Sequence, residues 1–92
     1  MTNKMYARGR AKEYRVKKQL ESEGWFVIRS AGSHSIVDLV AFMSAPTDSE
    51  PSGYLLRVRF IQCKPKGGYL SPEERAKKKE LEERLHITIE VL

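Results

Sequence analysis

Three polar residues stand in segments that otherwise have the composition of buried strands. Asp38 interrupts the apolar run Ile36–Ala41, and Gln62 and Lys64 end the run that begins at Tyr54. A carboxylate, a carboxamide and an amine that meet at the end of a sheet can hold a divalent metal ion against a phosphodiester. This combination predicts a nuclease.

The rest of the chain predicts the scaffold that would hold these residues. Gly24 is a helix stop, and the sequence Ser71-Pro72-Glu73-Glu74 is a strong helix start, with an N-cap serine and a glutamate at the third helical position. Aromatic and β-branched residues mark the strands. We expect helices at about 7–23 and from Pro72 to about Leu85, and strands at Trp25–Ile28, Ile36–Met43, Tyr54–Lys64 and Ile87–Val91.

The order of these elements predicts how they pair. A loop centred near residue 49 joins the second and third strands into an antiparallel hairpin, which places Asp38 opposite residues 59–64. Gln62 and Lys64 then share one face of the third strand, because side chains alternate along a strand. The last strand follows a crossover helix and should lie parallel to the third. The predicted fold is an α/β domain with a mixed four-stranded sheet flanked by helices.

The first helix offers a further acid. Glu13, Val16 and Leu20 lie on one helical face, so Glu13 points toward the sheet if the two apolar residues pack on it. Each polar residue also has a simpler interpretation. Glu13 would sit at the rim and pair with an arginine or lysine, Asp38 would accept backbone hydrogen bonds at the start of its strand, and Lys64 would be the exposed end of its strand.

Composition sets the class of protein and its partners. The chain of 92 residues is short enough to be a single domain, 1–92, with a basic arm at 1–7 and a flexible loop at 44–53. A net charge of +5 suits a nucleic-acid partner. The single cysteine, Cys63, cannot form an internal disulfide, which favours a reducing compartment. No run of 18 or more apolar residues is present, so no membrane partner is expected.

Three segments together resemble a known family. They are Gly9 with Glu13, the segment Gly24–Ser33 (Gly-Trp-Phe-Val-Ile-Arg-Ser-Ala-Gly-Ser) and the segment Val37–Ala41 (Val-Asp-Leu-Val-Ala). This pattern is similar to the archaeal-type Holliday junction resolvases of the PD-(D/E)xK nuclease superfamily, over most of residues 8–64. The resemblance implies a restriction-endonuclease-like core and a homodimeric, Mg²⁺-dependent endonuclease that nicks four-way DNA junctions. It also implies a cytoplasmic location, in a prokaryotic cell or its virus, in association with the nucleoid.

The resemblance also assigns roles to residues. Glu13, Asp38, Gln62 and Lys64 match the catalytic positions, and one or two Mg²⁺ ions (or Mn²⁺ in substitution) would be held by Glu13, Asp38, Gln62 and the Cys63 carbonyl. Lys64 would orient the attacking water or neutralise developing charge. The expected DNA contacts are mostly basic residues and small residues of the loop 30–35: Arg8, Arg10, Lys12, Arg29, Ser30, Gly32, Ser33, His34 and Lys66.

One departure from the family matters for function. Gln62-Cys63-Lys64 stands where most resolvases have Glu-x-Lys, and a glutamine brings a ligand oxygen but no charge. Gln-x-Lys is the usual form in Mrr-type restriction nucleases, so a restriction or nicking enzyme on duplex DNA is an alternative. A non-catalytic nucleic-acid-binding module of the same fold is another. The second helix, with few apolar residues, and the last strand are candidate dimer surfaces.

Overall fold

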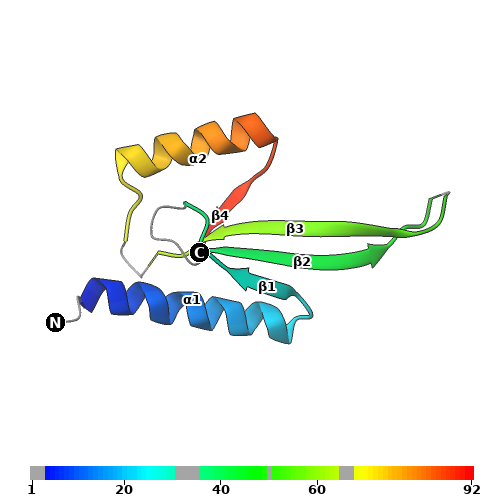
Figure 1. The fold of residues 1–92 in the computed structure, drawn as a ribbon, viewed down its shortest axis with the longest axis horizontal. Helices are drawn as coiled ribbons and strands as arrows, with labels where there is room; N and C mark the ends of the chain where they lie inside the picture. Colours follow the sequence, from blue (N-terminus) through cyan, green and yellow to red (C-terminus); the bar gives the residue numbers. More distant parts are fainter. Residues whose placement is uncertain (1–3, 31–35, 50, 65–67) are drawn as a thin grey trace.

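The elements follow one another in the predicted order. The computed structural model describes residues 4–30, 36–49, 51–64 and 68–92, and for residues 4–9 the backbone alone (Figure 1). Their bounds are α1 (Lys4–Ser22), β1 (Phe26–Arg29), β2 (Leu39–Pro46), β3 (Tyr54–Gln62), α2 (Pro72–Leu85) and β4 (Ile89–Val91).

The four strands form one sheet in the order β1-β2-β3-β4. The pairs β1–β2 and β2–β3 are antiparallel, and β4 pairs with β3 in parallel. The two helices lie on opposite sides of the sheet (Figure 1). The predicted α/β fold class is confirmed, and this arrangement is consistent with a restriction-endonuclease-like fold.

A small apolar core holds α1 against the sheet. Its side chains come from one face of the helix and from alternate positions of the strands, which is the pattern that packing of a helix on a sheet requires. Gly24, with φ of +98°, ends the helix, and the amide of Trp25 donates to the Leu20 carbonyl across the turn. The buried members of the core are Leu20, Val27, Leu39, Ala41, Ile61 and Cys63.

Several boundaries differ from the sequence expectation, and the differences are largest for α1 and β2. Helix α1 begins at Lys4, so residues 4–7 are helical instead of forming an arm, because this segment contains good helix formers and no proline or glycine. Strand β2 begins at Leu39 and ends at Pro46, where it pairs with Tyr54, so the loop is shorter than the predicted 44–53. Proline is tolerated there because β1 no longer pairs with β2 beyond Phe42, which leaves β2 at the edge of the sheet.

Helix α2 starts as its sequence predicts. Ser71 is the N-cap, and its side chain and that of Glu74 form a reciprocal capping box. None of the residues of α2 is buried, as expected for a helix with so few apolar residues. The helix is therefore placed by polar contacts near its two ends, which involve Glu74 and Glu82.

The sheet face opposite α1 carries an apolar surface that is largely exposed. The pairs Phe26–Phe42 and Phe42–Val58 run across three strands in register, and 68% of Phe26 and 62% of Leu56 are exposed. We call this surface the open apolar face; its members are Phe26, Ile28, Val40, Phe42, Leu56 and Val58.

Candidate active site

Asp38 lies where the hairpin geometry placed it. Its amide donates to the Ile61 carbonyl at 2.8 Å, and its own carbonyl accepts from the Ser30 amide at 2.8 Å. Since Leu39 pairs with Ile61, Asp38 stands opposite Gln62. The prediction that Asp38 faces residues 59–64 is confirmed, although Asp38 comes just before β2 and not within it.

The Asp38 carboxylate is half-buried at this end of the sheet. Its Oδ2 accepts a hydrogen bond from the Cys63 amide at 2.7 Å, as the simpler interpretation of Asp38 predicts. Burial raises the pKa of Asp38, the Cys63 amide opposes that rise, and the charges of Glu13 and Glu74 add to it. Among the described residues only this amide donates to the carboxylate, so Oδ1 remains open to another partner.

Gln62 is a buried polar side chain with one unsatisfied atom. Only 4% of the residue is exposed, and its Nε2 donates to Glu74 Oε2 at 3.3 Å. Its Oε1 is buried and has no hydrogen-bond partner among the described residues. A buried carbonyl oxygen without a partner carries a desolvation cost, which a bound cation or water would relieve. This atom is the observation that fits a hard metal ion.

Lys64 lies on the same side of β3 as Gln62. Its ammonium contacts Glu74 Oε2 at 2.6 Å, and the side chain is 24% exposed. Lys64 is therefore a paired lysine at the site and not simply the exposed end of a strand. The Lys64 ammonium and the Ser71 amide hold the pKa of Glu74 below its usual range, so this carboxylate is charged at neutral pH.

Glu13 approaches from the other helix. It accepts a hydrogen bond from Arg29 Nε at 2.8 Å, with 18% of the Glu13 side chain exposed, and the Arg29 guanidinium lies over the Tyr14 ring. Its charge contributes to the raised pKa of Asp38, so the two acids are neighbours. The pairing with arginine is the simpler interpretation of Glu13, and it also brings Arg29 to the site.

Of the remaining predicted positions, some are placed by the structure and others lie outside the described residues. Ser30 lies beside Asp38 through its backbone, and Arg10 and Lys12 lie on α1. Burial raises the pKa of the Cys63 thiol to about 12, so Cys63 offers its carbonyl and not a thiolate. Four loop residues, and one side chain, lie outside what the structure describes: Gly32, Ser33, His34 and Lys66, and the side chain of Arg8.

Sequence reasoning missed Glu74. Its pattern, Ser-x-x-Glu at a helix start, is fully explained by capping, so nothing in the spacing indicated a second role. Within the described ranges, no three His, Cys, Asp or Glu side chains group closely enough to hold a metal ion. A cation here would therefore need oxygens of other kinds, such as the Gln62 carboxamide and the Cys63 carbonyl, as in the predicted ligand set.

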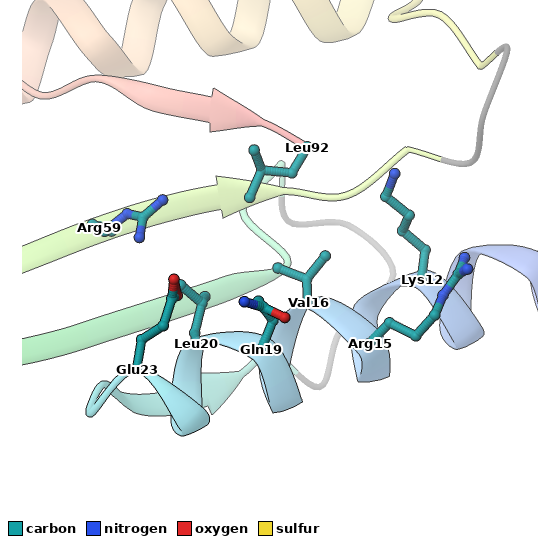
Figure 2. Close-up of a pocket in the computed structure, with 8 residues that line it drawn as sticks. All are labelled: Lys12, Arg15, Val16, Gln19, Leu20, Glu23, Arg59 and Leu92. Atoms are coloured by element: carbon teal, nitrogen blue, oxygen red, sulfur yellow. The ribbon is translucent and has the colours of Figure 1, made fainter.

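A basic groove runs beside the site, between α1 and the ends of β3 and β4 (Figure 2). Its volume is about 640 Å³. Lys12 and Arg15 line it from α1, and Lys12 lies near enough to Cys63 to affect the pKa of that thiol. Arg59 lies on the opposite wall, where Glu90 binds it through two hydrogen bonds of 2.6 and 2.8 Å. No ion pair joins Lys12 or Arg15 to another described residue, so the unpaired positive charge of the groove comes mainly from α1.

The comparison with protein families tests the resemblance to the archaeal-type resolvases. Residues 4–47 match the family model described as archaeal Holliday junction resolvase. The resemblance inferred from the motifs is thus confirmed over α1, β1 and β2, a segment that includes Glu13, Arg29 and, just before β2, Asp38. At the family level the match supports a Holliday junction resolvase nuclease that acts on DNA. Gln62, Lys64 and Glu74 lie beyond the matched segment. Comparison with curated proteins and with solved structures gave no match.

Neither helix of the described chain has the length and apolar character needed to cross a bilayer.

Proposed function

We propose that this protein is a homodimeric, Mg²⁺-dependent endonuclease that cuts four-way DNA junctions by paired nicks. The observation that carries the proposal is the meeting of Asp38, Gln62 and Lys64 at one end of the β2–β3 hairpin. They are three of the four positions that the resemblance assigns to catalysis, and they meet next to a basic groove. We expect the protein to act on DNA in the cytoplasm of a prokaryotic cell, in association with the nucleoid. The protein would belong to that cell or to its virus.

The site offers the oxygen donors that Mg²⁺ prefers. Asp38 Oδ1, Gln62 Oε1 and the Cys63 carbonyl would hold the ion, with Glu13 contributing negative charge; Mn²⁺ substitutes for it. The ion, when bound, supplies an activated water and stabilises charge on the attacked phosphate. Lys64 supplies a compact positive charge beside that phosphate.

The basic residues position the DNA. Arg29, held by Glu13, would bind a phosphate next to the one that is cut. Lys12 and Arg15 in the groove add backbone affinity that does not depend on sequence and that falls as salt rises. The loop residues Gly32, Ser33 and His34, and Lys66, remain predicted phosphate contacts.

Paired nicks require two sites at a fixed spacing, and therefore a symmetric dimer. The open apolar face is the surface that fits a second copy, because it joins exposed side chains of β1 and β3 across the half-buried Val40 and Phe42 of β2, and because it ends at the edge strand β1. Sedimentation tests this: Phe26→Arg should yield monomers. Leu55→Arg places the same charge on the opposite sheet face at a similarly exposed position, and it should leave the dimer intact. Equal dissociation constants for the two variants would remove this surface from the proposal.

The substrate is tested with a panel of synthetic DNAs. A resolvase makes symmetric nicks in a four-way junction and leaves linear duplex of the same sequence uncut in Mg²⁺. Equal cutting of linear duplex would favour the Mrr-like nuclease, which the Gln62-x-Lys64 pattern also suits. Binding of the junction without cleavage in Mg²⁺ or Mn²⁺ would favour the non-catalytic module.

A further inference from the structure

The site contains a carboxylate that the family pattern does not provide. Glu74 comes from the first turn of α2, which lies at the same end of the molecule as the end of β3 (Figure 1). Its Oε2 accepts from Lys64 Nζ at 2.6 Å and from Gln62 Nε2 at 3.3 Å. A single oxygen of Glu74 thus contacts both polar residues that end β3.

The placement of Glu74 suits the acid that is missing from β3. Gln62 occupies the position of the second acid, where it adds an oxygen but no charge. Glu74 contacts that carboxamide directly, and its charge contributes to the raised pKa of Asp38. Glu13 differs from Glu74 in its contacts: Arg29 binds its carboxylate, and within the described residues no hydrogen bond joins it to Gln62.

The capping box uses only one of the two oxygens of the Glu74 carboxylate. Oε1 accepts from the Ser71 amide at 3.0 Å, which completes the capping box and fixes the carboxylate at the start of α2. Oε2 is turned toward the strand instead. Next to it the Gln62 carboxamide is buried, and its Oε1 has no partner within the part of the chain that the structure describes, which is an independent sign of a ligand position.

We propose that Glu74 is the second metal-binding acid of this nuclease, supplied from α2 in place of the acid that β3 lacks. The inference rests on the proposed function. Asp38 and Glu74 then furnish the two carboxylates that bind the cation, Gln62 furnishes a neutral oxygen, and Glu13 adds its charge from α1. Lys64 neutralises Glu74 in the structure described here, so Lys64 and a divalent cation compete for the same carboxylate.

Moving the charge between residues 74 and 62 tests this assignment. Glu74→Gln removes the charge but keeps an oxygen for the Ser71 amide, since glutamine also serves in a capping box. Glu73→Gln removes a charge from the exposed neighbouring position of the same helical turn and is the matched control. The double variant Gln62→Glu/Glu74→Gln returns the charge to the strand.

Calorimetric titration of Mn²⁺ into each protein without DNA is the first readout, and junction cleavage is the second. Glu74→Gln should weaken Mn²⁺ binding by about tenfold or more. Glu73→Gln should change it by less than about twofold, as expected for an exposed charge. The double variant should recover Mn²⁺ affinity and cleavage, and a purely structural role of Glu74 would give no such recovery.

Two results separate the inference from the function on which it rests. If the wild type cleaves junctions and Glu74→Gln binds Mn²⁺ as well as Glu73→Gln does, the role of Glu74 is overturned and the nuclease stands. The same holds if the double variant fails to recover. If the wild type neither binds Mn²⁺ nor cleaves DNA, the proposed function is overturned and this inference falls with it.

Discussion

The two helices are held to the sheet in opposite ways. Helix α1 buries Leu20 in the core and packs Val16 against it, so apolar contact fixes its C-terminal part on the sheet. Helix α2 buries no residue and is attached through Glu74 to Lys64 and through Glu82 to the Ile89 amide. Helix α1 is therefore part of the packed scaffold of the domain. The position of α2 depends instead on charged side chains, one of which, Glu74, lies in the candidate site.

The largest difference between the two helices should appear when an apolar side chain of each is truncated. Leu20→Ala removes a side chain that is 3% exposed and should lower the free energy of unfolding by about 3 kcal/mol. Leu85→Ala, at a residue of α2 that is 52% exposed, should cost less than about 0.5 kcal/mol. Urea denaturation followed by circular dichroism measures both values. Similar costs would show that α2 is packed and not merely tethered.

The basic residues of the two helices should differ in DNA binding. Lys12→Ala/Arg15→Ala removes two charges of the groove and should weaken junction binding by about tenfold at low salt, with a shallower salt dependence. Lys77→Ala/Lys79→Ala removes two charges from the exposed surface of α2 and should change binding by less than about twofold. Fluorescence anisotropy at several salt concentrations gives the affinities and slopes. A larger effect of the α2 pair would reassign the DNA interface to α2.

Acid should loosen the far end of α2 with a small, local effect. The Ile89 amide, and to a lesser extent Lys78, lower the pKa of Glu82. A lowered pKa means that this attachment is complete above the usual range of a glutamate and is lost as pH falls through the lowered value. Nuclear magnetic resonance of the Ile89 amide should follow this titration below pH 4.5, with its hydrogen bond to Glu82 weakening. An Ile89 amide signal that does not change in this pH range would contradict the attachment of α2 through Glu82.

The same contrast explains what could be predicted from the sequence. The order of elements, the capping box of α2 and the position of Asp38 opposite Gln62 follow from apolar periodicity, capping residues and the length of the hairpin loop. Those signals are local, or are repeated along an element. The start of β2 was placed three residues early because Ile36 and Val37 are apolar and resemble strand residues although they precede it.

The role of Glu74 could not be predicted in this way. A polar contact between a helix start and a strand end leaves no periodic pattern, and the capping motif already explains a glutamate at that position. The pairing of Glu13 with Arg29 was foreseen only as a pairing with some arginine or lysine, because the partner depends on how α1 lies over β1. Apolar patterns thus predicted the scaffold, and tertiary polar contacts completed the site.

Cleavage of a four-way junction by the wild type beside Asp38→Asn and Lys64→Ala tests the central claim most directly. The wild type should make paired nicks that depend on Mg²⁺. Each variant should still bind the junction, but its cleavage rate should fall by about 100-fold or more. A wild type that binds the junction as tightly as Asp38→Asn and cuts it in neither Mg²⁺ nor Mn²⁺ would contradict the account.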